Sequence, residues 1–170
     1  AGVVFAARYE IEEVIGRGGM GTVYKAHDRN LDETVALKLI RPDLVPHLSI
    51  LERFKHETRL ARRLAHPNII KGYDFNESDG IVYLSMEYLE GKDLRTRIIE
   101  EGPLPIDEAI DIACQVSAGL SYAHANGVLH RDIKPHNVFI TSDGRVKLLD
   151  FGLAKAVDST QLSSTGQMLG

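Results

Sequence analysis

An Asp-Gly pair between two short apolar runs places the strongest local constraint on this chain. The largely apolar stretches 138–140 and 146–149 flank Asp143 and Gly144. Asp-Gly in this setting favours a two-residue hairpin turn, because both central residues of such a turn need a positive φ. The sequence therefore predicts an antiparallel hairpin that closes at Asp143-Gly144.

Counting outward from that turn gives a predicted register. Successive pairs lead from 141/146 to Asn137 opposite Asp150 at the open end. A carboxamide and a carboxylate side by side suit Mg²⁺, which takes hard oxygen ligands and keeps phosphate oxygens and water. Asp132 precedes Asn137 closely enough to share the site as a base. From the hairpin alone, a surface hairpin with ordinary polar ends is the alternative.

The residues around the hairpin resemble the catalytic loop of protein kinases. The stretch HRDIKPHN at 130–137 is followed by DFG at 150–152, and this composite resembles the catalytic loop and Asp-Phe-Gly segment of that family. Lys134-Pro135 inside the loop resembles the serine/threonine group rather than the tyrosine group. The resemblance is closest to bacterial receptor-type kinases.

The resemblance implies a role for each matched residue of this segment. Asp132 would orient an acceptor hydroxyl and accept its proton, and Lys134 would neutralise the transferred phosphoryl group. Asn137 and Asp150 would hold two Mg²⁺ ions, for which Mn²⁺ is a substitute. His130 is expected to pack against Phe151.

Composition is that of a globular protein. The 170 residues are 44% hydrophobic and 26% charged, with a net charge of −4, and the mixed charges give no sign of nucleic-acid binding. No apolar run approaches the roughly 20 residues that span a bilayer. We expect a cytoplasmic domain, with any membrane anchor of the parent protein outside this stretch. Cys114 is the only cysteine, which excludes an internal disulfide, and we expect it to be a small buried residue of a helix.

A glycine cluster near the start forms the pattern G-x-G-x-x-G-x-V, at Gly16, Gly18, Gly21 and Val23. A dinucleotide-binding fold shares the first six positions but needs a helix directly afterwards. Here β-prone residues and then a polar turn follow, so strand–turn–strand is predicted. Such a hairpin can lay its amides over phosphates, because glycine permits close approach. A flexible turn is the alternative.

The next elements place two opposite charges on inward faces. Residues 33–40 alternate as a third strand, with Lys38 on the face of Ala36, and residues 48–65 have helical period with Glu57 on the apolar stripe. A buried carboxylate needs a cation, and Lys38 is the natural partner, as in the lysine–glutamate pair of the family. An edge position that reaches water is the alternative for each.

Two further strands are predicted at 69–75 and 81–87, joined by a turn at 76–80. The segment MEYLEG at 86–91 resembles the hinge of the family, where backbone groups bind adenine. Gly72 departs from the family pattern, which usually has a bulky apolar residue there. By resemblance, the nucleotide is bound by Ile15, Gly16, Arg17, Gly18, Gly19, Met20, Gly21, Thr22, Val23, Ala36, Lys38, Glu57, Met86, Glu87, Leu89 and Phe139.

Two helices are predicted in the second half. A short one covers 93–101, and the longest covers 106–125. The apolar spacing of the long helix predicts a buried stripe made of Ile106, Ala109, Ile110, Ala113, Val116, Ser117, Leu120 and His124.

The predicted fold is α+β and protein-kinase-like. It has an N-terminal lobe of antiparallel sheet plus one helix at 1–87, a hinge at 88–91 and the first part of a mainly helical lobe at 92–170. A kinase domain of this family needs about 250–280 residues as a single domain, so we expect an incomplete domain that stops within its activation segment. Ser163 and Thr165 resemble phosphorylation sites of that segment, with Arg131 as the phosphate partner.

The predicted function is ATP-dependent phosphorylation of serine or threonine in protein substrates, with trans-autophosphorylation in a homodimer. Two alternatives belong to other classes. One is a catalytically silent ATP-binding or dimerising module. The other is a small-molecule kinase of related fold, which Lys134-Pro135 disfavours.

Overall fold

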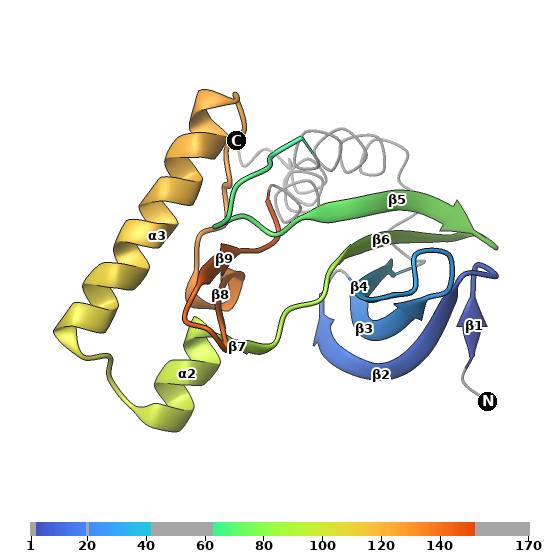
Figure 1. The fold of residues 1–170 in the computed structure, drawn as a ribbon, viewed down its shortest axis with the longest axis horizontal. Coiled ribbons are helices and arrows are strands. Elements are labelled where there is room, and N and C mark those ends of the chain that lie inside the picture. Colours follow the sequence, from blue (N-terminus) through green and yellow to red (C-terminus); the bar gives the residue numbers. More distant parts are fainter. Residues whose placement is uncertain (1–2, 20, 42–62, 152–170) are drawn as a thin grey trace, which may run out of the picture. The chain divides into compact units, whose positions relative to one another are not determined.

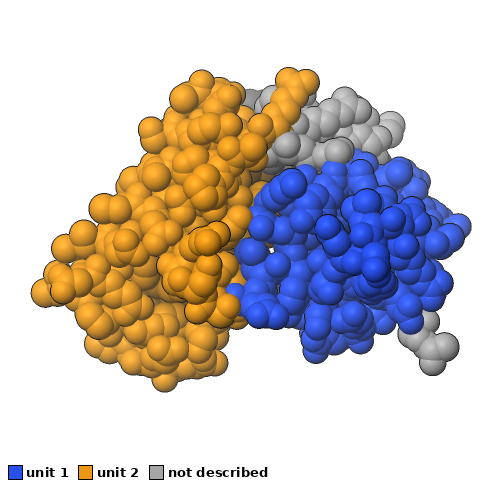
Figure 2. Space-filling view, viewed as in Figure 1, with its two compact units in different colours: residues 1–51, 71–90 blue, residues 52–70, 91–170 orange. Residues whose placement is uncertain are grey.

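The computed structural model describes residues 3–19, 21–41 and 63–151. The chain divides into two compact units, one formed by residues 1–51 and 71–90 and the other by residues 52–70 and 91–170 (Figure 2). In the part of the chain that the structure describes, no helix is both long and apolar enough to cross a membrane.

The first unit is a six-stranded antiparallel sheet (Figure 1). Its strands follow the order β1-β2-β3-β4-β6-β5 and have the bounds Val4–Phe5 (β1), Tyr9–Gly18 (β2), Gly21–Asp28 (β3), Glu33–Ile40 (β4), Gly72–Ser78 (β5) and Ile81–Glu87 (β6). The glycine cluster thus lies in a β-hairpin, as predicted. Strands β4 and β6 also begin and end at the predicted residues.

The turn between β5 and β6 corrects the predicted boundaries. Strand β5 continues to Ser78, which pairs with Ile81, so the turn consists of Asp79 and Gly80 rather than of residues 76–80. Both residues have a positive φ, 52° and 75°. This is the geometry of a two-residue primed turn. The strand begins at Gly72 instead of residue 69, because residue 69 pairs elsewhere.

A buried ion pair lies where β2 begins and β3 ends. Asp28 is 1% exposed and accepts hydrogen bonds from Arg8 Nε at 2.8 Å and Arg8 Nη2 at 2.6 Å. The Asn30 N–H also donates to Asp28, at 3.0 Å. Arg8 Nη1 reaches Asp74 on β5 at 2.8 Å. The guanidinium of Arg8, the residue directly before β2, therefore links β3 and β5 to the start of β2. The aromatic side chains of Phe5, Tyr9 and Tyr83 pack together nearby.

The second unit combines a three-stranded sheet with helices. The sheet order is β7-β8-β9, and the elements have the bounds Gly91–Asp93 (β7), Leu94–Glu101 (α2), Ile106–Ala125 (α3), Pro135–Asn137 (η2, one turn of 3-10 helix), Val138–Thr141 (β8) and Val146–Leu148 (β9). Helix α3 packs against β9 around a core that includes Ile69, Ile112, Leu148 and Phe151.

Both helices match their predicted positions for local reasons. Asp93 caps α2, since its carboxylate accepts from the N–H groups of Arg95 and Thr96. Gly102 ends the helix with a φ of 83°, a conformation that suits glycine. Helix α3 covers residues 106–125 as predicted.

The buried face of α3 agrees with the predicted stripe only in part. Val116 and Leu120 pack against the core, as predicted. The buried residues are Ile112, Gly119 and Ala123, whereas Ile106 is 78% and Ile110 57% exposed. Ala113, Ser117 and His124 of the predicted stripe are exposed as well. Small residues face inward because the helix approaches the chain at Asn68 and Leu148 closely, as a Cβ on Gly119 would lie 3.1 Å from Asn68 O. The exposed Cys114 corrects the expectation that this residue is buried.

The hairpin β8–β9 forms with a register one residue away from the predicted one. Val138 pairs with Leu148, so the loop contains three residues, 142–144. Only Gly144 among them has a positive φ, 82°. Thr141 stabilises this wider loop, because its Oγ1 accepts from Arg145 N at 3.0 Å. Leu149, not Asp150, therefore stands opposite Asn137, where the Leu149 N–H donates to Asn137 O at 2.9 Å.

We expect Asp28→Asn to destabilise the chain at neutral pH but not in acid. The Arg8 guanidinium lowers the pKa of the Asp28 carboxyl, so the pair stabilises the fold above the unfolded pKa of about 3.9 and loses this contribution as pH falls through the lower folded pKa. Urea unfolding at pH 7 should show a loss of about 2 kcal/mol that shrinks below about pH 4. Asp74→Asn is the control and should cost less, because Asp74 is 41% exposed. An equal loss at both pH values would contradict this account.

Candidate active site

The catalytic-loop residues form a hydrogen-bonded cluster in the second unit. Lys134 Nζ lies 2.7 Å from Asp132 Oδ2, and Asn137 Nδ2 donates to Asp132 Oδ2 at 3.0 Å and to Asp132 O at 2.8 Å. The Lys134 ammonium lowers the pKa of the Asp132 carboxyl, with a smaller contribution from Asn137. Asp132 is thus an ionised, half-buried carboxylate that can accept a hydrogen bond from a substrate hydroxyl.

His130 is a buried, neutral side chain that supports the catalytic loop. It is 2% exposed and stacks on Phe151 with ring centroids 4.6 Å apart, as predicted. Its Nε2 lies 2.7 Å from Leu149 O, and its Nδ1 accepts from Asp132 N at 3.3 Å. Nε2 therefore carries the proton. Burial lowers the pKa of His130, in keeping with this neutral tautomer.

Two residues flanking the cluster adopt the left-handed backbone conformation. Arg131 has a φ of 65° and Asp150 a φ of 52°. Such values cost a non-glycine residue roughly 1–3 kcal/mol and persist only where surrounding contacts impose them. The bend at Asp150 follows directly after Leu149, which is bonded to Asn137 and His130.

The oxygen atoms of this unit fit a divalent cation. Both hydrogen bonds from the Asn137 amide start at Nδ2, which leaves Oδ1 outside them. Asp150 adds a carboxylate next to the residue that pairs with Asn137. Across residues 63–151 and the other described ranges, no three His, Cys, Asp or Glu side chains form a metal cluster. Two protein ligands completed by phosphate and water are the pattern that Mg²⁺ prefers.

The glycines of the hairpin in the first unit differ in how closely the sheet surrounds them. Gly16 pairs with Val23, Arg17 with Thr22 and Gly18 with Gly21. A Cβ on Gly21 would lie 2.0 Å from Leu39 O, whereas a Cβ on Gly18 or Gly19 would meet nothing within 4 Å. Gly21 is therefore required by the sheet, whereas Gly18 and Gly19 are not restricted by contacts with the described residues. A bulge between Val14 and Gly16 leaves Ile15 without a partner in the ladder, and Ile15 is 44% exposed.

Lys38 and the residues around it occupy the centre of the same sheet. Lys38 is 6% exposed and pairs with Val23 on one side and Leu84 on the other. Ala36 and Met86 are buried and pair with each other. The predicted face for Lys38 and Ala36 is thus confirmed by the register.

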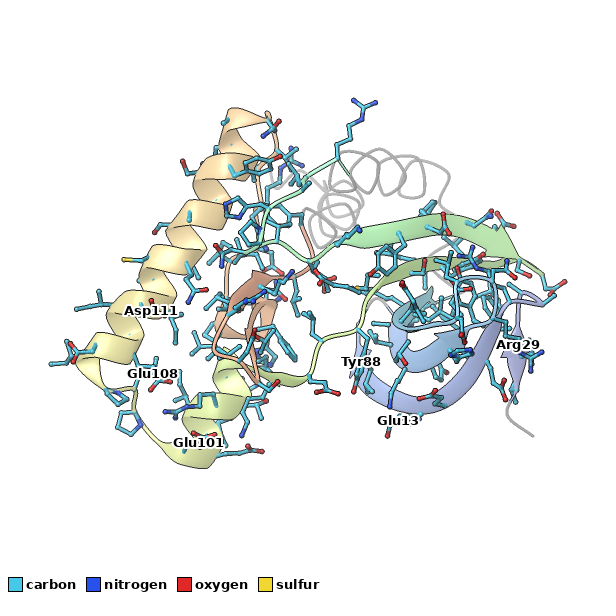
Figure 3. The ribbon with its side chains drawn as sticks, viewed as in Figure 1. Glu13, Arg29, Tyr88, Glu101, Glu108 and Asp111 are labelled. Carbon is cyan, nitrogen blue, oxygen red and sulfur yellow. The ribbon has the colours of Figure 1, made fainter. Side chains whose placement is uncertain are left out.

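The hinge segment follows β6. The Glu87 N–H donates to Lys71 O at 2.9 Å, so this amide is used within the protein. Tyr88 contacts the hairpin strand β3, since Lys25 Nζ lies 5.3 Å from its ring centroid. Lys25 Nζ also lies 4.0 Å from Glu13 Oε1 (Tyr88 and Glu13 are labelled in Figure 3). In the second unit, Phe139 is half-buried on β8 opposite Asp93 and Lys147.

Some predicted site residues lie outside the described residues. These are Met20, Glu57, Gly152, Ser163 and Thr165, together with residues 48–62 of the helix expected at 48–65. Residues 63–65 are described and are not helical, which corrects the predicted end of that helix. The pairing of Lys38 with Glu57 and the phosphorylation sites therefore stay predictions.

No sequence pattern predicted the polar residues that hydrogen-bond to the hairpin β8–β9 from neighbouring segments. Asn68 and Gln115 hydrogen-bond to Val146. The one available signal was a glutamine within a largely apolar and small-residue helix, at a position that the predicted stripe left on the outer face.

Comparison with known proteins identifies the family. The protein kinase domain model matches residues 9–168. The chain is 44% identical over 165 residues to the serine/threonine-protein kinase PrkC of Bacillus subtilis, covering 97% of this chain and 26% of PrkC. It is 39% identical to PknB of Mycobacterium leprae, covering 96% of this chain and 27% of PknB. The PknI kinase domain of Mycobacterium tuberculosis superposes with a TM-score of 0.81 at 38% identity, covering 90% of this chain and 62% of that domain.

This chain belongs to the protein kinase domain family. It spans about a quarter of the length of these curated relatives. Membership implies the use of ATP and a divalent metal ion. The side-chain oxygens of Asn137 and Asp150 are of the type that such an ion binds.

We expect the stability of this unit to fall between pH 7.5 and 5.5 because of His130. The pKa of His130 is lowered in the fold, so the unfolded chain binds a proton that the folded chain resists, and stability decreases as pH falls below the unfolded value of about 6.5. Chemical unfolding of His130→Phe should lose this part of the pH slope while keeping the ring contact with Phe151. The exposed His124→Gln serves as the control and should retain the slope of the unmodified chain. A slope unchanged in His130→Phe would contradict the assignment.

Proposed function

We propose that this chain is the nucleotide-binding and catalytic part of a serine/threonine protein kinase. The observation that carries the proposal is the Asp132 carboxylate, held by Lys134 and Asn137 within 3.0 Å. The names of PrkC and PknB describe serine/threonine-protein kinases, which supports the same acceptor class here.

In the proposed reaction, an acceptor hydroxyl oxygen forms a bond to the γ-phosphorus of ATP. The bond from that phosphorus to the β,γ-bridging oxygen breaks, ADP leaves, and the hydroxyl proton passes to Asp132. The lowered pKa of Asp132 keeps it ionised, so its first task is to orient the hydroxyl, and it takes the proton late. Lys134 neutralises charge on the phosphoryl group.

Asn137 and Asp150 are proposed to bind the divalent cation. The ion, Mg²⁺ with Mn²⁺ as a substitute, would supply neutralisation of the phosphate charges. In the first unit, Lys38 is proposed to hold the α- and β-phosphates. Gly18 and Gly19 support a role in covering phosphates, because glycine has no side chain of its own to block close approach.

The proposed regulation is phosphorylation of Ser163 and Thr165. A second copy of the chain would act in trans, so a homodimer is part of the proposal. Arg131, exposed beside Asp132, is the proposed partner of the phosphate, because guanidinium and phosphate form charge-assisted hydrogen bonds.

We expect Asp132→Asn to abolish most phosphotransfer without unfolding the chain. The substitution keeps the shape but removes the charge that accepts the proton, so kcat should fall by about 10²- to 10⁴-fold. Radiolabelled ATP with a generic basic protein acceptor measures the rate, and thermal unfolding tests integrity. The matched control is Asp143→Asn in the exposed hairpin loop, which should keep full activity. Unchanged turnover in Asp132→Asn would refute the assignment, and binding of ATP without any turnover in the unmodified chain would favour a silent module.

A further inference from the structure

Asp150 owes its bent backbone to the two residues before it. Leu148 N donates to Asn68 O at 2.9 Å, and Leu148 O accepts from Ile70 N at 3.0 Å. Leu149 N donates to Asn137 O at 2.9 Å, and Leu149 O lies 2.7 Å from His130 Nε2. All four backbone groups of Leu148 and Leu149 are therefore bonded, on alternating sides. Directly after this clamp of four bonds the chain turns through the left-handed conformation of Asp150.

One side of the clamp is an additional strand segment. Residues 68–70 run parallel to β9, with Ile69 paired to Leu148. They occupy the edge of β9 that faces away from β8. In the sheet β7-β8-β9 that edge would otherwise have unbonded N–H and C=O groups.

Gln115 on α3 joins this segment to β9. Its Oε1 accepts from Val146 N at 2.8 Å and from Asn68 Nδ2 at 3.0 Å. Its Nε2 donates to Asp111 Oδ2 at 2.8 Å and approaches Gly144 O at 3.4 Å. The orientation of the amide is unambiguous, because the backbone N–H of Val146 can only donate. Gln115 thus uses both its amide hydrogens and both lone pairs of its oxygen.

Asn68 completes the bridge from the other direction. Its Nδ2 donates to Val146 O at 2.9 Å as well as to Gln115, and its own N–H donates to His66 Nδ1 at 3.1 Å. His66 stacks on Tyr122 of α3 with centroids 5.0 Å apart. The N–H and C=O of Val146 are therefore both held by side chains that come from distant parts of the chain.

We propose that Asn68 and Gln115 are positioning residues for Asp150, acting through strand β9. Asn68 and Gln115 hold the backbone of Val146, and Asn68 also holds that of Leu148. The position of β9 in turn sets the backbone bend at Asp150 and thereby the place of its carboxylate. The inference rests on the proposed function insofar as Asp150 binds the divalent cation. Residues that orient a metal ligand without touching the metal change metal affinity when they are removed.

The experiment compares Gln115→Leu with the unmodified chain in two measurements. The first is hydrogen exchange of the amides in residues 146–151. The second is calorimetric affinity for ATP with MnCl2 and for ATP with EDTA. We expect faster exchange in residues 146–151 and about tenfold weaker binding of ATP with Mn²⁺, while binding of ATP in EDTA stays unchanged.

Two further variants separate positioning from general stability. Gln115→Glu combined with Asp111→Asn keeps the oxygen that accepts from Val146 and Asn68 and places an amide donor opposite the new carboxylate, so this pair of substitutions should restore most of the Mn²⁺-dependent affinity. Asp111→Asn keeps an acceptor for Gln115 Nε2 at the position labelled on α3 in Figure 3, and should behave like the unmodified chain. If Gln115→Leu does not fold, Asn68→Ser removes the same bridge from its other side, and the same shifts are expected.

Several outcomes would overturn the proposal. Unchanged exchange in residues 146–151 would do so, as would faster exchange with unchanged Mn²⁺-dependent affinity. An equal loss of affinity with Mn²⁺ and with EDTA would reduce Gln115 to a structural residue. If the unmodified chain binds ATP no better with Mn²⁺ than with EDTA, the proposed function fails, and the exchange comparison alone then decides whether Asn68 and Gln115 position Asp150.

Discussion

The four backbone hydrogen bonds of Leu148 and Leu149 are the constraint on which the second unit depends. They join strand β9 to the catalytic loop through Asn137 and His130, and to residues 68–70 on the opposite edge. Because a buried backbone group without a partner is costly, each of these bonds restricts where its neighbours can lie. The left-handed Asp150 is the consequence of that restriction, and it places a carboxylate next to the catalytic loop.

In each of the two units, a carboxylate is paired with a basic side chain. The buried Asp28 accepts three hydrogen bonds from Arg8, and Asp132 is held ionised by Lys134. His130, which has no opposite charge in hydrogen-bond contact, is buried as a neutral ring. A buried ionised group needs a partner, whereas a neutral imidazole needs only two hydrogen bonds. The ion pair of Asp28 with Arg8 stabilises the first unit. The neutral His130 supports the loop that contains Asp132.

The residues of the candidate site could be named from their spacing, but their geometry could not. Asp132, Lys134 and Asn137 lie within one loop, so a short contiguous pattern was enough to expect them together. The register of β8–β9 was wrong by one residue, because Thr141 and Arg145 stabilise a three-residue loop that competes with the two-residue turn. A backbone bend, and not pairing with Asn137, determines the position of Asp150. No local residue pattern predicts such a bend.

Local residue patterns were sufficient for the order and type of most elements, from the alternation in β4 to the glycine hairpin and the span of α3, because each depends on neighbours along the chain. Distant contacts decided the rest. They turned Ile112 and Gly119 of α3 inward instead of Ile106 and Ile110, and they brought Asn68 and Gln115 onto the edge of β9. The physical reason is that a hydrogen bond between side chains on separate segments leaves no periodic trace in either segment, and it exists only once both have packed against the same strand.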